Sequence, residues 1–207
     1  TVFSDDYYSL TAGGGSGIKI LGGDVTVSGD LTVDANVTTS MGGNNLTVTN
    51  ATDIDGTLAV AGDTLNLDGA SDIDGTITIS TGTVDANGAF DATNGTITFT
   101  DAGNLNLDST VTSLGMLSDN FGTVTYDGVD QTVFSDVYYN LTAGGGSGTK
   151  TLGGTVTVAN DLTIDTDVTI AMDTHLLTVT DITDIDGTLA VTDNILTLNG
   201  SSDIDGT

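Results

Sequence analysis

The chain contains no cysteine, no proline and no tryptophan. Glutamate and arginine are absent too, so every acidic residue is aspartate. Two lysines stand against 29 aspartates, which gives a formal net charge of −27 over 207 residues. The lack of cysteine excludes disulfide bonds as a source of stability. The charge argues against nucleic acid or an anionic membrane surface as a partner, because both require basic patches.

Long apolar runs are also missing, since none approaches the roughly 18 residues that a membrane-spanning helix needs, and we expect no membrane insertion. A hydrophobic fraction of 37% is nevertheless too high for a disordered acidic tail. Apart from alanine, good helix formers are scarce, and threonine, valine, isoleucine, glycine, asparagine and aspartate dominate. The composition therefore predicts an almost wholly β protein.

A long internal repeat organises the chain. The stretch TVFSDDYYSLTAGGGSGIKILGG at 1–23 returns as TVFSDVYYNLTAGGGSGTKTLGG at 132–154, so that Thr1 maps onto Thr132. The same offset holds to the last residue, where Thr76 maps onto Thr207, and roughly two thirds of the aligned positions are identical. We therefore divide the chain into a first long repeat, 1–131, and a partial second one, 132–207, within one continuous unit.

A shorter period of about 20 residues lies inside the long repeat. Apolar-x-apolar triplets recur at nearly even intervals, and they start at positions 25, 46, 65, 84, 105 and 124. Asp-Gly and Asn-Gly turn signals separate these short strands. A sandwich has no reason to repeat DIDGTLAV as DIDGTITI one period later, whereas every coil of a solenoid has similar neighbours. We predict an all-β parallel β-helix (β-solenoid) with coils of about 20 residues and three short strands per coil.

The TVFSD segment interrupts the even spacing, because the triplet that follows Val124 in the series starts only at Val156, well beyond one period. We interpret the excess, which is more than half a coil, either as one larger coil with a flexible surface loop or as a protrusion that contacts a neighbouring rod. The second interpretation makes the aromatic residues of both copies candidate interaction residues: Phe3, Tyr7, Tyr8, Phe134, Tyr138 and Tyr139.

Asp-x-Asp-Gly motifs are the sharpest local signal. Within each long repeat the two motifs are one short period apart, so in a solenoid they should lie on adjacent coils about 5 Å apart. Carboxylates at that distance repel, and Ca²⁺ would offset the repulsion. The alternative is that these side chains accept turn N–H groups and face solvent. The candidate metal ligands are Asp53, Asp55, Asp72, Asp74, Asp184, Asp186, Asp203 and Asp205.

The run GTVTYDG…QTVFSDVYYNLTAGGGSGTKTLGGTVTVANDLTID at 122–165 resembles repeats of very large secreted or surface-anchored bacterial β-helix proteins, of the filamentous haemagglutinin and adhesin type. The resemblance implies an extracellular or cell-surface shaft. Because the repeat pattern stops part-way at Thr207, we expect the chain either to continue in a longer polypeptide or to associate end to end with its own copies. A Ca²⁺-dependent adhesive or matrix module is the first alternative. A carbohydrate-active β-helix is the weaker one, and we expect no enzyme, because the recurring aspartates form no singular site and arginine and glutamate are absent.

Overall fold

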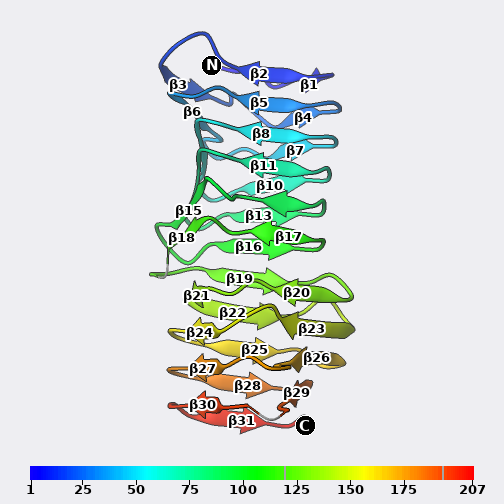
Figure 1. Ribbon diagram of the computed structural model, residues 1–207. Coiled ribbons are helices and arrows are strands. Elements are labelled where there is room, and N and C mark those ends of the chain that lie inside the picture. Colours follow the sequence, from blue (N-terminus) through cyan, green and yellow to red (C-terminus); the bar gives the residue numbers. More distant parts are fainter. Residues whose placement is uncertain (119, 193) are drawn as a thin grey trace.

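The computed structural model describes residues 1–118, 120–192 and 194–207. The chain winds into an upright rod of stacked coils, with the N-terminus at one end and the C-terminus at the other (Figure 1). All paired strands run parallel, and no helix occurs among the described residues. The predicted β-solenoid, with three strands per coil and about ten turns, is confirmed. The described residues therefore contain no helix that could cross a membrane.

One sheet runs the whole length of the rod and is called the long sheet here. Its eleven strands are hydrogen-bonded in chain order, each to the strand one coil later. They are β1 (Asp6–Tyr7), β4 (Val25–Val27), β7 (Leu46–Val48), β10 (Thr64–Leu67), β13 (Thr83–Ala86), β16 (Asn104–Leu107), β19 (Thr123–Tyr126), β22 (Asn140–Ala143), β25 (Leu162–Ile164), β28 (Thr183–Ile185) and β31 (Ser202–Ile204).

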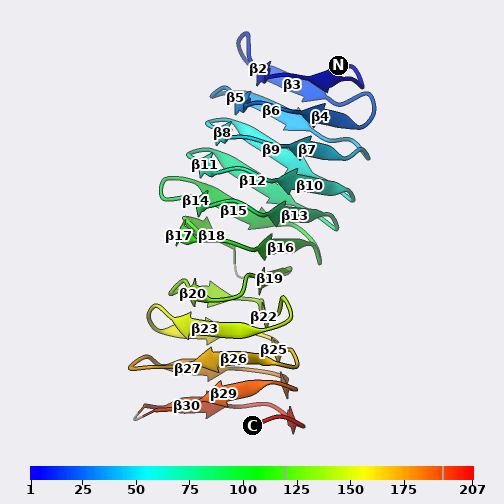
Figure 2. The ribbon, with the colours of Figure 1, turned by 90° about the vertical axis from the view of Figure 1, so that its right-hand side faces the viewer.

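Two six-stranded sheets complete the first part of the rod (Figure 2). The β2–β17 sheet contains β2 (Leu10–Ala12), β5 (Leu31–Val33), β8 (Thr52–Ile54), β11 (Ser71–Ile73), β14 (Phe90–Asp91) and β17 (Val111–Ser113). The β3–β18 sheet contains β3 (Gly17–Ile20), β6 (Val37–Ser40), β9 (Thr57–Val60), β12 (Thr76–Ile79), β15 (Thr96–Phe99) and β18 (Met116–Leu117).

Two new four-stranded sheets take over beside the long sheet in the second part. The β20–β29 sheet contains β20 (Gln131–Val133), β23 (Gly148–Leu152), β26 (Val168–Ala171) and β29 (Thr188–Ala190). The β21–β30 sheet contains β21 (Val137–Tyr138), β24 (Val156–Val158), β27 (Leu177–Val179) and β30 (Leu196–Leu198).

Alternation along each strand builds one continuous core. In β10 the side chains of Leu65 and Leu67 are fully buried, while Thr64 and Asn66 face outward, as the strand period of two requires. In-register pairing then places each buried residue over its equivalent in the next coil. One such column contains Val25, Leu46, Leu65, Val84, Leu105, Val124, Leu141 and Leu162.

The recurring glycines are explained by coil stacking. A Cβ built on Gly75 would lie 2.0 Å from the carbonyl oxygen of Gly56, its equivalent one coil earlier. Gly88 meets Gly69 in the same way, at 2.1 Å. Real Cβ atoms do not come that close to backbone, so each corner of this kind accepts only glycine without a backbone shift. The Asp-Gly and Asn-Gly signals therefore mark tightly stacked corners.

Each segment of the second long repeat lies in a different sheet of the rod from its equivalent in the first long repeat. Register pairing carries Asp6 through six coils to Thr125, which also lies in the long sheet. The repeat equivalent of Asp6 is Val137, which lies more than half a coil further along and belongs to the β21–β30 sheet. In the same way, Thr52–Ile54 belongs to the β2–β17 sheet, while its repeat equivalent Thr183–Ile185 belongs to the long sheet.

The interpretation of the TVFSD segment as one enlarged coil with a surface loop is wrong. Val124 pairs with Leu141 one coil later. This step along the sequence is shorter than the step from Leu105 to Val124 and the step from Leu141 to Leu162, so the coil is not enlarged. Val156 starts β24, in a different sheet. The extra residues supply β20 and β21, which begin the two new sheets and shift the sequence to the next face.

Candidate functional site

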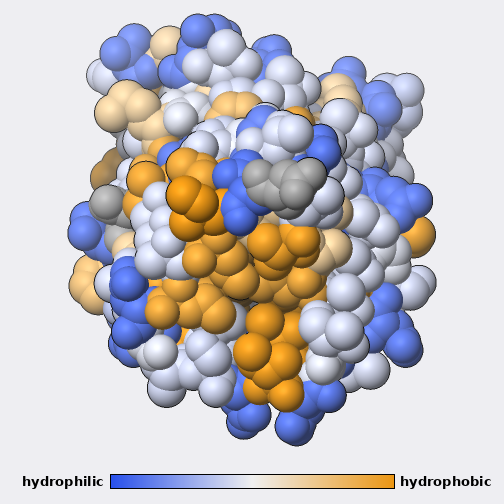
Figure 3. All heavy atoms as spheres, turned by 60° about the horizontal axis from the view of Figure 1, so that its bottom comes forward, coloured by the Kyte–Doolittle hydropathy of each residue, from blue (hydrophilic) through white to orange (hydrophobic). Residues whose placement is uncertain are grey.

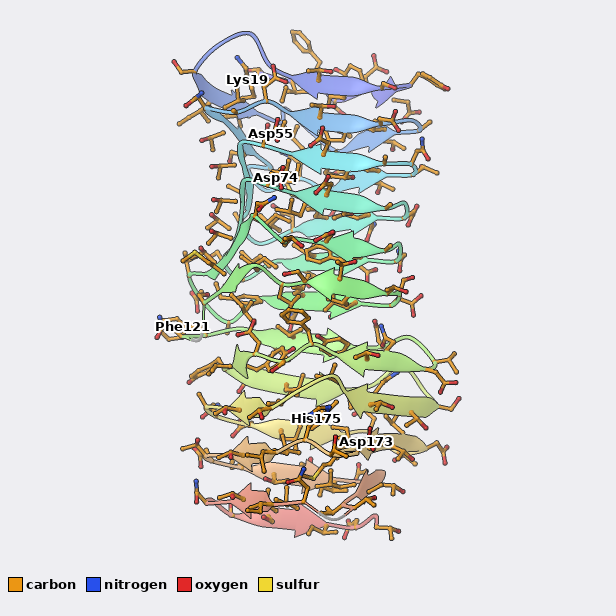
Figure 4. The ribbon with its side chains drawn as sticks, viewed as in Figure 1. Lys19, Asp55, Asp74, Phe121, Asp173 and His175 are labelled. Carbon is orange, nitrogen blue, oxygen red and sulfur yellow. The ribbon has the colours of Figure 1, made fainter. Side chains whose placement is uncertain are left out.

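An acidic column runs along the outer side of the β2–β17 sheet. Asp53 pairs in register with Asp72, and Asp72 pairs with Asp91. Neighbouring strands in a sheet are about 4.8 Å apart, so three carboxylates lie on three successive coils. Asp55 and Asp74 follow at the adjoining corner, one coil apart (Figure 4). The predicted stacking of the Asp-x-Asp motifs is therefore present in the structure.

The environment of this column raises the pKa of its central carboxyls. Partial burial raises the pKa of Asp53, and the charges of Asp55, Asp72 and Asp74 add to the effect. For Asp72, burial again comes first, followed by the charges of Asp74 and Asp91. Both causes disfavour the ionised form. The folded rod therefore holds protons at this column more tightly than the unfolded chain does.

We expect the rod to become more stable as the solution is acidified from pH 7 towards pH 4. A raised folded-state pKa means that the native state binds more protons than the unfolded chain above about pH 3.8, the reference value for aspartate, so the free energy of unfolding increases as pH falls through that window. Thermal unfolding monitored by circular dichroism at pH 7, 6, 5 and 4 measures this. A melting temperature that falls steadily over the same range would contradict it, and the double variant Asp53→Asn, Asp72→Asn should flatten the profile.

The second long repeat places its motifs in the long sheet. Asp184 pairs with Asp203, with Asp186 and Asp205 at the following corner. Burial raises the pKa of Asp184, and the charges of Asp186 and Asp203 contribute next. The eight candidate ligands thus form two pairs of motifs on different sheets. Among the described residues, no group of three or more carboxylate or imidazole side chains could hold a metal ion.

The aromatic residues of the TVFSD segments form a second site, where the chain changes face. Tyr126 and Tyr138 are both fully buried, and their hydroxyl oxygens are 2.9 Å apart. The Tyr138 hydroxyl donates to the carbonyl oxygen of Phe134 at 2.7 Å, and the Phe134 N–H donates to the Tyr126 oxygen at 3.0 Å. Burial raises the pKa of Tyr126 to about 12, partly offset by these hydrogen bonds. The network satisfies polar groups at a point where the regular ladders are interrupted.

The first copy has part of the same network. The hydroxyl of Tyr7 donates to the carbonyl oxygen of Phe3 at 3.0 Å, as Tyr138 does to Phe134. The spacing of phenylalanine and tyrosine that both TVFSD segments share therefore serves a local fold. The predicted role of Tyr138 in contacting a neighbouring rod is corrected by the structure, because this side chain lies inside the core. Its inward direction follows from strand alternation, which sends the adjacent Tyr139 to the other side.

The other candidate interaction residues are accessible to different degrees. Phe3 is 76% exposed and Tyr8 is 84% exposed. Tyr7 and Phe134 are half-buried against the core. Tyr139 is half-buried, with its ring centroid 6.0 Å from that of Phe121, which projects from the side of the rod (Figure 4). Phe3 and Tyr8 are therefore the most exposed of the six candidates, and contact of these aromatic residues with a partner stays a prediction.

Two polar residues that the sequence analysis did not single out support the same region. Lys150 is fully buried, and its ammonium donates to the carbonyl oxygen of Val129 at 3.2 Å. Burial lowers the pKa of Lys150, opposed by the charges of Asp127 and Asp130. The sequence does indicate that Lys150 is buried, because Lys150 and the apolar Leu152 are two residues apart and must lie on the same side of a strand.

Gln131 replaces ladder hydrogen bonds at the corner below β16. Its side-chain oxygen accepts from the Gly128 N–H at 2.8 Å, and its amide nitrogen donates to the carbonyl oxygens of Leu107 at 2.7 Å and Ser109 at 2.8 Å. Backbone groups on adjacent coils are thus joined through a side chain at this point. Glutamine occurs only once in the chain, so no repeat or spacing could indicate a role for Gln131.

His175 lies in a turn of the second long repeat, at the position that Asn44 occupies in the first (Figure 4). Its backbone N–H donates to the Met172 carbonyl oxygen at 2.9 Å.

The chain was compared with protein-family models, with curated proteins and with solved structures, and none of them matches.

Proposed function

We propose that this protein is a structural shaft, part of a fibre or giant adhesin outside the bacterial cell. One observation carries the proposal: an eleven-stranded parallel sheet runs from β1 to β31 with a continuous apolar core behind it. Main-chain hydrogen bonds in this arrangement point along the rod axis, so bending or stretching the rod must strain many of them together. With coils about 4.8 Å apart, ten coils make a rod about 50 Å long.

The coil at the C-terminal end leaves apolar side chains uncovered. Ile195 is 65% exposed and Ile204 is 54% exposed, and apolar residues gather into one patch on this end of the rod (Figure 3). Ile204 continues the core column of Ile164 and Ile185, so a further coil would cover it as β31 covers β28. The exposed end of this column would accept a further coil of the same kind, whether that coil belonged to the same polypeptide or to another copy.

Electron microscopy of the purified protein tests the shaft proposal. We expect thin fibres of constant width, several times longer than the roughly 50 Å of one rod, at high protein concentration. Because the charge of −27 repels neighbouring rods sideways, fibres should be single at low salt and should bundle as salt is added. Discrete compact particles under every salt and concentration condition would exclude the proposal.

A calcium-dependent adhesive or matrix role is the second candidate, and the in-register pairs Asp53–Asp72 and Asp184–Asp203 favour it. Each pair places two carboxylates on adjacent strands, where a divalent cation would relieve their repulsion. If this candidate holds, millimolar CaCl₂ raises the melting temperature more than NaCl of equal ionic strength. Equal effects of the two salts would reduce calcium to general screening.

A further inference from the structure

An open groove of about 780 Å³ lies where the two parts of the rod meet, beside the β17 and β20 strands. Its lining includes Asp108, Thr110 and Val111 from the coil of β17, and Asp130 and Thr132 from the coil of β20, together with Thr149. Everywhere else within the β2–β17 and β20–β29 sheets, strands one coil apart pair directly. The strands β17 and β20, both wholly within the described residues, do not pair, and the ribbons separate visibly between them (Figure 1).

Both strands present backbone groups to this groove. The carbonyl oxygen of Thr110 accepts from Phe90 in β14, so the alternation of a parallel ladder turns the N–H and C=O of Val111 the other way. The carbonyl oxygen of Val133 accepts from Gly153 beside β23, so the N–H and C=O of Thr132 turn away from β23. Val111 and Thr132 both line the groove. Among the described residues, the backbone groups of Val111 and Thr132 have no strand partner on this side. Gln131, which donates to the carbonyl oxygens of Leu107 and Ser109, lines the same groove.

The charge of the groove limits what can enter it. Asp108 and Asp130 are both exposed at its margins, and the rod as a whole carries −27. The one nearby lysine, Lys150, is buried and donates to Val129. A second copy of this chain would bring its own −27, whereas a basic segment would be attracted. Threonine and serine hydroxyls supply further polar contacts along the same walls.

We propose that the groove binds an extended, basic peptide segment, with lysine or arginine at alternate positions, which adds a strand at the β17 and β20 edges. Strand addition supplies main-chain hydrogen bonds to an exposed sheet edge, and alternate side chains supply specificity. Here one side of the added strand would place its cations beside Asp108 and Asp130. The shaft function does not depend on this site, so either proposal can be wrong while the other holds.

The test uses the unmodified full chain and a fluorescein-labelled peptide, TKTKTKT, followed by fluorescence anisotropy. We expect saturable binding that weakens with added salt, and at least tenfold weaker binding of TETETET. The same lysine peptide with alternate amides N-methylated should also bind at least tenfold more weakly. Hydrogen exchange of the Val111 and Thr132 amides should slow at least tenfold when the peptide is bound, because both N–H groups acquire partners.

Matched charge variants locate the site. Asp108→Lys should weaken binding of TKTKTKT at least tenfold, while Asp6→Lys, the same charge change on exposed β1, should change it less than twofold. Equal loss in both variants, or unchanged exchange at Val111 and Thr132, would show diffuse attraction to the acidic rod and overturn the proposal. Absence of saturable binding, equal binding of the N-methylated peptide, or preferential binding of neutral oligosaccharides would overturn it as well. The exchange measurement on the unmodified chain decides the matter even if Asp108→Lys fails to fold.

Discussion

Replacing Gly75 with alanine is expected to lower the free energy of unfolding by about 1–3 kcal/mol, towards the upper end of that range. The new Cβ would lie 2.0 Å from the Gly56 carbonyl oxygen of the preceding coil. The obstructing atom is backbone, so it cannot rotate away as a side chain would. Two stacked coils must therefore separate locally, which weakens the ladder on both sides of the corner. Urea unfolding followed by circular dichroism measures the difference.

Gly62→Ala is the matched control. At this turn the nearest atom to an added Cβ is the Thr81 side-chain oxygen at 3.4 Å, an ordinary contact. The variant should change stability by no more than about 0.5 kcal/mol, or stabilise slightly by restricting the unfolded chain. Equal losses for Gly75→Ala and Gly62→Ala would mean that the coils are not stacked corner over corner.

Tyr126→Phe should cost about 1–3 kcal/mol, because it removes an oxygen that takes part in two buried hydrogen bonds. The Phe134 N–H loses its acceptor and the Tyr138 hydroxyl loses its 2.9 Å contact. The ring itself stays buried, so the loss reports the hydrogen bonds rather than a cavity. Chemical unfolding gives the free energy, and amide exchange at Phe134 should become faster in the variant.

Tyr8→Phe serves as the control for this hydroxyl. Tyr8 is 84% exposed, so its variant should lie within about 0.5 kcal/mol of the parent protein. If Tyr126→Phe proved equally neutral, the buried tyrosine pair would not stabilise the region where β20 and β21 begin the two new sheets. That result would also weaken the assignment of β20 and β21 as strands that begin new sheets.

The coil architecture could be predicted because stacking leaves a direct mark on the sequence. DIDG at 53–56 and at 72–75 differ by one coil, and the structure pairs Asp53 with Asp72 as that spacing requires. Alternation in triplets such as Leu65–Leu67 gave the inward residues correctly. The Asp-Gly and Asn-Gly pairs were predicted as turns, and the structure adds that Gly75 and Gly88 lie where successive corners approach too closely for a Cβ.

The change of face could not be predicted, because periodicity reports that two segments are equivalent in sequence without saying which side of the rod each occupies. The stretch between Val124 and Val156 fits a long loop as well as it fits two added strands. Only the pairing of Val124 with Leu141 separates the two. Tyr138 and Tyr139 present the same difficulty at smaller scale, since both are aromatic and only one can point inward.

The distance between two spin labels across the face change tests the stacked, shifted solenoid most directly. Thr47 and Thr163 lie in one outward column of the long sheet, six coils apart, through Asn66, Asp85, Asn106, Thr125 and Thr142. Labels on cysteines at these two positions should be about 29 Å apart, six steps of about 4.8 Å, with a narrow distribution. A broad distribution, or a narrow one centred well away from this value, would contradict the account.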